Sequence, residues 1–251
     1  MMPGMHTSLR ALSFDLDDTL WPIRPVIERA EAALHAHLEA HCPRTARAYP
    51  PARLRALREQ VALENPQLAH DFGRQRLLSL VQALSECGDD PAEAGPACEA
   101  LYAERNRVDF YADALPALDA LGARFPLAAL TNGNADLQRI GIAGRFAVVV
   151  AAREFGVAKP ERAIFAHTVA RLGLDPAEVL HVGDDPWLDV DGAARAGLRT
   201  CWVNRNAADW PAGLPRPDLE VATLAGLVAA LADAAPLPAA SVGRTEPGTL
   251  A

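Results

Sequence analysis

Three aspartates stand within four positions of the chain, at Asp15, Asp17 and Asp18. Carboxylates this close repel one another, so a fold keeps them together where a cation or a reaction uses them. They follow an apolar run over residues 10–14 that predicts a buried strand. Asp15 and Asp17 are two residues apart, so their side chains point the same way in extended chain. Ligands of an open α/β sheet bind beyond the carboxyl ends of its strands, and we expect a site here.

Three further polar clusters fall at strand ends or in the turns that follow: Thr131-Asn132-Gly133-Asn134, Lys159-Pro160, and the run from Gly183 to Asp189. The first offers a hydroxyl, an amide and a glycine turn that we expect to open a helix, which would suit an anion. Lys159 presents a point charge to an anion. The last cluster supplies a second set of carboxylates, led by Asp184.

These residue types together indicate phosphoryl transfer. Carboxylates from two strand ends, completed by water, form the oxygen site that magnesium prefers. A hydroxyl, an amide and a lysine beside that site can hold a phosphoryl group, whose transfer needs charge neutralisation and an in-line nucleophile. One aspartate can be that nucleophile and form an acyl phosphate. A second carboxylate can protonate the leaving alcohol and then activate water.

The elements that must position these residues alternate in the pattern of an α/β protein with a parallel sheet. Apart from the first strand, we expect strands over residues 127–130, 147–151, 179–182, 200–203 and 219–221. Asp175, followed by Pro176 and Glu178, forms a capping box that predicts a helix start. Asp185 before Pro186 predicts another.

Between the first two clusters the chain changes to helical periodicity, rich in Ala, Leu, Glu and Arg, over about residues 25–108. We expect four or so helices there, forming a small all-α cap. The predicted domains are an α/β core over residues 8–21 and 113–235 and a cap over 22–112. Residues 236–251 are expected to be disordered. Insertion directly after the acidic cluster suits a lid over the site.

Composition excludes several classes of protein. The chain has 251 residues, half of them hydrophobic, and a formal net charge of -8, which argues against a general role in nucleic-acid binding. Its four cysteines form no C-x-x-C pair, so no zinc knuckle or redox pair is indicated. The N-terminus lacks a signal-peptide apolar region, and no run is long enough to span a membrane. We expect a cytoplasmic monomer or homodimer.

The ordered motifs D-x-D-D-T-L, T-N-G-N, K-P and G-D-D-x-x-x-D resemble those of the haloacid dehalogenase superfamily, over about residues 9–204. The resemblance implies a Rossmann-like three-layer core and a magnesium-dependent aspartyl-phosphate mechanism. The insertion is similar to the helical cap that part of this superfamily carries after the first motif.

The resemblance also implies roles for individual residues. Asp15 matches the nucleophile and a metal ligand, and Asp17 matches the general acid and base, with its main-chain carbonyl on the metal. The other matches are Thr131 and Lys159 for phosphate binding with Asn132 beside them, Asp184 for metal binding, and Asp189 for a lysine-orienting acid. Asp185 stands where many members have serine or asparagine, so its role is open.

Several functions share these motifs, and Asp17 favours a phosphatase, because the dehalogenases of the superfamily lack this second aspartate. The alternatives are a 2-haloacid dehalogenase, a sugar phosphomutase and a catalytically dead binding protein.

A narrower resemblance is to bacterial flavin-pathway phosphatases. It is carried by the stretches D-L-D-D-T-L-W, T-N-G-N-A, H-V-G-D-D and T-C-W-V. That group acts on 5-amino-6-(5-phospho-D-ribitylamino)uracil, FMN and small sugar phosphates. Substrate-contact roles for Trp21, Arg24, Arg105 and Arg107 stay open, and His181 is expected to be a hydrogen-bonded core residue.

Overall fold

The computed structural model describes residues 9–232 and contains the predicted parallel sheet. Its six strands lie in the order β3-β2-β1-β4-β5-β6, and every neighbouring pair is parallel. Their bounds are β1 Ala11–Phe14, β2 Leu127–Thr131, β3 Val148–Ala151, β4 Val179–Gly183, β5 Arg199–Val203 and β6 Leu219–Val221. The predicted α/β fold class is therefore confirmed. The predictions for residues 1–8 and 236–251 fall outside the described range.

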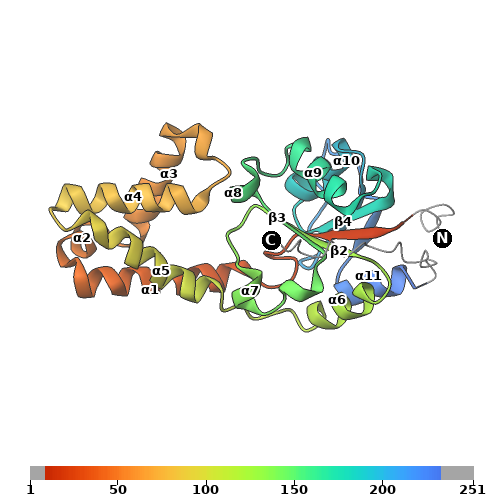
Figure 1. Cartoon of the computed structure of the whole chain (residues 1–251), viewed down its shortest axis with the longest axis horizontal. Helices are drawn as coiled ribbons and strands as arrows, with labels where there is room; N and C mark the ends of the chain where they lie inside the picture. Colours follow the sequence, from red (N-terminus) through yellow and green to blue (C-terminus); the bar gives the residue numbers. More distant parts are fainter. Residues whose placement is uncertain (1–8, 233–251) are drawn as a thin grey trace, which may run out of the picture.

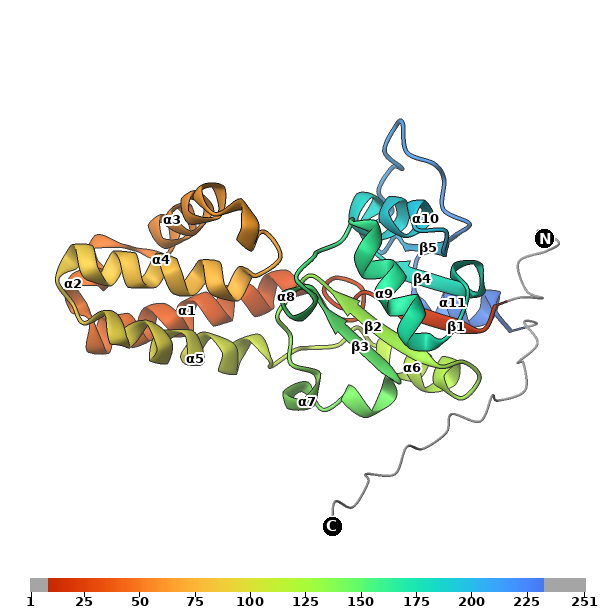
Figure 2. The same cartoon turned by 45° about the horizontal axis from the view of Figure 1, so that its top comes forward.

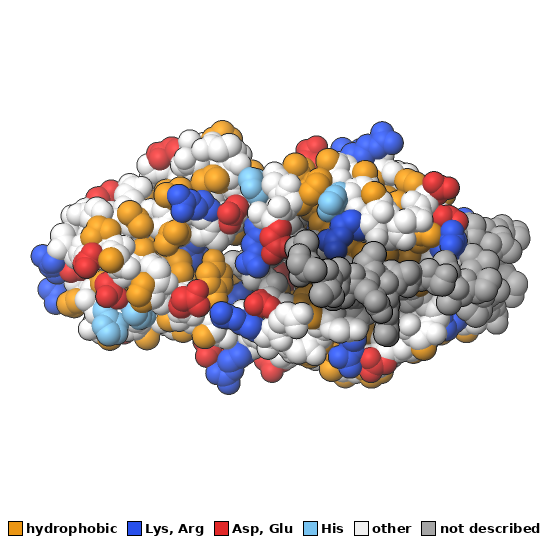
Figure 3. Space-filling view, in the orientation of Figure 1, with side chains coloured by type: hydrophobic (Ala, Val, Ile, Leu, Met, Phe, Trp, Pro, Cys, Tyr) orange, Lys and Arg blue, Asp and Glu red, His pale blue; other side chains and the backbone are white. Residues whose placement is uncertain are grey.

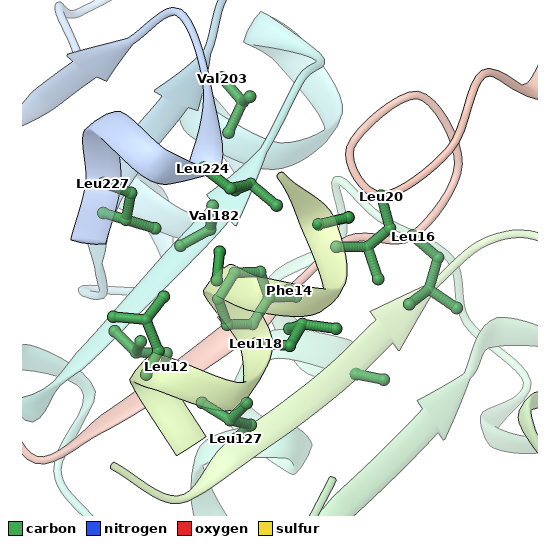
Figure 4. Close-up of a cluster of buried hydrophobic side chains, with 14 of the residues drawn as sticks. Leu12, Phe14, Leu16, Leu20, Leu118, Leu127, Val182, Val203, Leu224 and Leu227 are labelled. Atoms are coloured by element: carbon green, nitrogen blue, oxygen red, sulfur yellow. The ribbon is translucent and has the colours of Figure 1, made fainter. Parts of the chain in front are cut away.

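Apolar side chains cover both faces of the sheet, as the near-continuous hydrophobic runs of its central strands require. On one face, Leu12 and Phe14 of β1 pack with Leu118 of α6 and Leu224 of α11 (Figure 4). On the other, Ala11 packs in a cluster that includes side chains from α9 and α10. These helices are α6 Ala114–Gly122, α9 Arg162–Leu172, α10 Gly192–Arg195 and α11 Leu224–Ala230. The result is a three-layer core in which β1 lies at the centre (Figure 2).

The remaining elements of the core are short. They are α7 Leu137–Ile140, α8 Ala152–Phe155, the 3₁₀ turns η3 Ala143–Arg145 and η4 Pro176–Glu178, and the π-helical turn η5 Pro186–Asp191. The helix predicted after Asp175 was wrong in extent: its capping box is present, but it opens only η4, because β4 begins at Val179. Asp185 does cap the following turn, accepting from the backbone of Trp187 and Leu188.

A helical bundle is inserted between β1 and α6 and lies at one end of the molecule (Figures 1 and 2). It holds five α-helices, one more than the approximate prediction: α1 Ile23–His41, α2 Pro43–Ala48, α3 Pro51–Glu64, α4 Phe72–Cys87 and α5 Ala94–Arg105. The turns η1 Pro66–Leu68 and η2 Pro91–Glu93 join them. An apolar cluster that includes Leu34, Leu38, Leu80, Leu84 and Leu101 holds the bundle together. Within residues 9–232, no helix is both long and apolar enough to cross a membrane.

Candidate active site

The carboxyl ends of the strands and the helical bundle enclose a cavity of about 530 Å³. It is lined by each predicted site residue: Asp15, Asp17, Thr131, Asn132, Lys159, Asp184 and Asp189. Lys, Arg, Asp and Glu side chains gather on the surface where the bundle meets the core (Figure 3). The fold therefore brings together residues from four separate segments of the chain, as the strand-end argument predicted.

Lys159 lies at the floor of this cavity between two carboxylates. Its Nζ is 2.5 Å from Asp15 Oδ1 and 2.6 Å from Asp189 Oδ1. Burial opposes the lysine charge, but the two carboxylates outweigh it and hold the pKa of Lys159 above its usual range. Asn132 fixes the lysine backbone, because its side chain accepts from Lys159 N at 2.7 Å and donates to Lys159 O at 2.9 Å. The ammonium is thus held charged and aimed at Asp15.

Asp189 is the centre of a buried hydrogen-bond network. Apart from Lys159, it contacts His181 Nε2 at 3.2 Å and accepts from Asp185 N at 3.0 Å. Burial favours its neutral acid, yet Lys159 and His181 hold the pKa of Asp189 far below its usual range. His181 Nδ1 lies 3.1 Å from Ser13 Oγ in the core, which confirms that this histidine is a hydrogen-bonded core residue. Both oxygens of Asp189 are occupied by protein donors.

Asp15, Asp184 and Asp189 form an acidic group whose nearest oxygens all lie within 4.8 Å of one another. Burial raises the pKa of Asp15 to about 7 and that of Asp184 to about 8, and the neighbouring carboxylates add to both shifts. Protein cations do not fully offset this negative charge. Carboxylate oxygens whose negative charge is not balanced by protein cations are the kind of ligand that a hard divalent metal ion prefers. Because Asp189 is fully engaged, Asp15 and Asp184 are the acids free to ligate one.

Asp17 faces the same cavity and is held by Arg105 of the bundle and Trp21 of the core. Arg105 Nη2 donates to both of its carboxylate oxygens, at 2.8 and 2.7 Å, and Trp21 Nε1 donates at 2.8 Å. Arg105 is only 1 % exposed and ends α5, so the last helix of the bundle is tied directly to this aspartate. Gly133 leaves the space that Asp17 fills, because a Cβ there would lie 2.5 Å from Asp17 Oδ2.

The turn after β2 differs from its prediction in one respect. Thr131 Oγ1 accepts from Gly133 N at 2.9 Å, which folds the turn over the cavity. The helix expected to open at this turn begins only at Leu137, where Asp136 caps α7. No helix N-terminus of residues 131–134 therefore faces the cavity, and Thr131 contributes its hydroxyl.

The structure also places the residues whose roles stayed open. Trp21 is fully buried, donates to Asp17 and packs edge-on against Phe110. Arg24 and Arg107 point to solvent, each paired with a nearby glutamate on its own helix or turn. Asp18 is a turn residue at φ 58° whose carboxylate accepts from Ile23 N.

Sequence reasoning did not assign Arg105 to Asp17 and did not single out two further cavity residues, Arg58 and Arg76. The sequence did show that these residues are arginines in a predicted helical cap, and this was the one sign that they could face the site. Which cap arginines face the site depends on how the helices pack, and sequence periodicity alone does not give that packing.

A family model for haloacid dehalogenase-like hydrolases matches residues 9–197, which span all four motifs and the helical bundle. The protein is a haloacid dehalogenase-like hydrolase. As a member of this family, it is an enzyme built on an α/β core with an inserted helical cap, here α1 to α5.

Named relatives of this hydrolase include phosphatases and dehalogenases. It is 34 % identical over 227 residues to the 5-amino-6-(5-phospho-D-ribitylamino)uracil phosphatase YigB of Escherichia coli K12, covering 87 % of this chain and 94 % of YigB. A phosphoserine phosphatase of Thermus thermophilus is 39 % identical over 130 residues, 49 % of this chain and 52 % of that protein. The solved structure of a 2-haloacid dehalogenase from Pseudomonas syringae superposes with a TM-score of 0.84 at 35 % identity, covering 89 % of this chain and 98 % of that one.

Proposed function

We propose that the enzyme is a magnesium-dependent phosphomonoester hydrolase that works through an aspartyl phosphate on Asp15. The observation that carries this proposal is the placement of two carboxylates with different partners at one cavity. Asp15 is faced by the Lys159 ammonium at 2.5 Å, whereas Asp17 is held apart from that lysine by Arg105 and Trp21. This difference supports a nucleophilic role for Asp15 and a proton-transfer role for Asp17.

In the first step, an Asp15 oxygen bonds to phosphorus while the ester bond to the leaving oxygen breaks. Lys159 and the Thr131 hydroxyl hold the phosphoryl oxygens, and Asp17 in its acid form gives its proton to the leaving oxygen. In the second step, Asp17 takes a proton from water, whose oxygen bonds to phosphorus. The bond between phosphorus and Asp15 breaks, which releases inorganic phosphate and restores the Asp15 carboxylate and the acid form of Asp17.

The residues that would hold magnesium are Asp15, Asp184 and the main-chain carbonyl of Asp17, with Asp189 serving to orient Lys159. When bound, the ion would supply positive charge that offsets the developing charge on the phosphoryl oxygens. The raised pKa values of Asp15 and Asp184 support this assignment, since both carboxylates need a cation to stay ionised at neutral pH.

We infer that the substrate is a small phosphorylated metabolite, with 5-amino-6-(5-phospho-D-ribitylamino)uracil of riboflavin biosynthesis as the first candidate and FMN as the second. The similarity to YigB along most of both chains supports this choice. A cavity of about 530 Å³ is in the range of small-molecule sites. We further infer a cytoplasmic location, because all four cysteines are free thiols.

A second candidate is 2-haloacid dehalogenase activity, which the similarity to the Pseudomonas syringae structure favours. The residues of the cavity argue against it. Asp17, the second aspartate, is present and has dedicated hydrogen-bond donors, and Asp184 adds a second acid from the neighbouring strand. Displacement of halide by Asp15 would use neither group as an acid or a metal ligand.

One assay set tests the proposal. The purified protein should hydrolyse para-nitrophenyl phosphate with magnesium and lose that activity in EDTA, and should release no halide from 2-chloropropionate. In a panel of phosphorylated metabolites, the ribitylaminouracil phosphate and FMN should be among the best substrates. Halide release without metal, and no phosphate release with it, would replace the phosphatase with the dehalogenase.

A further inference from the structure

Two arginines of the helical bundle line the cavity and have no counter-ion among the residues that the structure describes. Arg76 lies on α4 and is only 8 % exposed, and Arg58 on α3 is half-buried. Within residues 9–232, neither guanidinium forms a hydrogen bond or an ion pair. Arg105, which lines the same cavity, contrasts with both because its Nη2 pairs with Asp17.

A largely buried guanidinium without a protein partner is costly, because it loses much of its hydration and gains no protein hydrogen bond in return. Burial, with the nearby Arg58 charge adding to it, lowers the pKa of Arg76 below its usual range. The carboxylate whose charge acts on Arg76 is that of Glu31, and Glu31 is paired with Arg55 at 3.2 Å. The stability of the bundle therefore does not account for Arg76, whereas a ligand that brings acceptor oxygens into the cavity would.

The position of Arg76 says which part of a substrate it would meet. The cavity runs from Asp15 and Lys159 on the core to Arg58 and Arg76 on the bundle. Its walls on the bundle side include the apolar side chains of Ile27, Phe72 and Leu101, and Phe72 is exposed despite its size. A phosphomonoester with its phosphoryl group at Asp15 would direct its leaving group toward these residues.

We propose that Arg76, with Arg58 beside it, is a binding subsite for paired acceptor oxygens on the leaving group of the substrate. The inference rests on the proposed phosphatase function and narrows its substrate class. The preferred substrates are phosphomonoesters whose alcohol carries a carboxylate or a ring with two carbonyl oxygens. Simple alkyl and aryl phosphates leave the subsite unfilled. A planar guanidinium suits such oxygens, because its donors form a fixed fork.

Two matched substrate pairs test the subsite. Phosphoserine and phosphoethanolamine differ by a carboxylate, and the ribitylaminouracil phosphate and ribitol 5-phosphate differ by the ring. In at least one pair, wild type should prefer the member that carries the carboxylate or the ring. The pair that shows this preference tells which of the two groups the subsite binds. Arg76→Met should lower kcat/KM for that member by about 10- to 100-fold, mainly through KM, as expected for lost hydrogen bonds to a charged group. The partner without the oxygens should change less than about twofold.

Variants separate binding from folding. Arg74→Met is the control, because Arg74 is exposed on the same helix and lies outside the cavity lining. It should leave every rate unchanged, and Arg76→Lys should restore part of the preference. Arg76→Met should also raise the melting temperature, since it removes an uncompensated buried charge. A lower melting temperature with equal losses on all substrates would show that Arg76 only supports the bundle and would overturn the subsite.

Calorimetric binding of 5-amino-6-ribitylaminouracil and of serine tests the subsite without turnover. Wild type should bind at least one of them more tightly than Arg76→Met does. Equal affinities in the two proteins, or unchanged preferences in the substrate pairs, would overturn the subsite while leaving the phosphatase proposal intact. If wild type hydrolyses no phosphomonoester, the phosphatase proposal fails, and a binding difference at Arg76 would still show the subsite.

Discussion

Arg105 reaches from the end of α5 to Asp17, where one guanidinium nitrogen contacts both carboxylate oxygens at 2.8 and 2.7 Å. The pair joins the last helix of the inserted bundle to the proposed acid and base of the core. Arg105 is almost fully buried, so its end of the contact is shielded from solvent, while Asp17 faces the cavity. A change in the position of the bundle would therefore change the orientation of Asp17, which links closure over the cavity to proton transfer.

Replacing Arg105 should impair proton transfer more than substrate binding. Arg105→Met leaves Asp17 with Trp21 as its remaining side-chain donor. We therefore expect kcat/KM for an alkyl phosphate, which reports the steps up to loss of the leaving group, to fall by about 100-fold, the scale of general acid catalysis. The fall should be smaller for para-nitrophenyl phosphate, whose leaving group needs no proton. Arg107→Met is the control, because Arg107 is exposed and its ion pair, with Glu104, lies on the surface. Equal losses on both substrates would contradict the positioning role.

Gly133→Ala should disturb Asp17 from the opposite side. The added Cβ would lie 2.5 Å from Asp17 Oδ2 and 3.2 Å from Thr131 Oγ1, so the aspartate must move. We expect kcat to fall at least about tenfold for alkyl phosphates, with a small change in melting temperature. The matched control is Gly144→Ala, where a Cβ has no neighbour within 4 Å. A fully active Gly133→Ala enzyme would show that the Asp17 position is not critical.

Asp189→Asn should cost both stability and rate. The substitution keeps the shape of the side chain but removes the charge that Lys159 and His181 share, and breaking one partner of a buried ion pair costs about 3–5 kcal/mol. Denaturant unfolding should show that loss, and kcat should fall because Lys159 is no longer held toward Asp15. Asp191→Asn, which removes a partly exposed pair with Arg195, should cost about 0.3–0.5 kcal/mol. Similar losses of unfolding free energy in the two variants would contradict the role of Asp189 as the centre of a buried hydrogen-bond network.

The metal-free protein should become less stable as pH rises from about 5 to 9. Asp15 and Asp184 have folded-state pKa values of about 7 and 8, above their unfolded value of 3.8. The folded protein therefore binds more protons than the unfolded chain in this window, and its stability falls as pH rises. His181, with a lowered pKa, opposes this trend only up to about its unfolded pKa of 6.5.

Magnesium should reverse that loss, because a bound cation favours the ionised carboxylates. Melting curves at pH 6 and pH 8.5, with magnesium and with EDTA, measure the effect. The stabilisation by magnesium should be larger at the higher pH. Asp184→Asn should reduce it, since one proposed ligand is gone. Equal stabilisation at both pH values in wild type would contradict a metal site built on Asp15 and Asp184.

Much of the core could be predicted from the sequence, because its signals are local. Apolar runs placed all six strands within one residue of their observed ends. The acids and Lys159 followed from the rule that strand carboxyl ends meet, and the structure brings them to one cavity. The capping box at Asp175 correctly marked the start of a helical turn, but the length of the helix was wrong. A cap shows where a helix can start and not how far it continues.

The cap side of the site could not be predicted in the same way. Arg105 lies 88 residues from Asp17, and their contact depends on how α5 packs along α1. Arg76 belongs to a helix whose arginines look alike in the sequence, yet Arg74 is exposed and Arg76 is buried at the cavity. The packing of one helix on another sets these differences, and helical periodicity alone does not specify it.

The central claim is that Asp15 carries the phosphoryl group during turnover. Asp17→Asn should slow hydrolysis of the intermediate, because the residue that activates water is lost. Acid quenching of this variant with para-nitrophenyl phosphate and magnesium, followed by tandem mass spectrometry, should find one phosphoryl group on Asp15. That group should be absent in EDTA and in the Asp15→Asn variant. A turning-over enzyme with no covalent phosphate, or with phosphate on another residue, would contradict the mechanism.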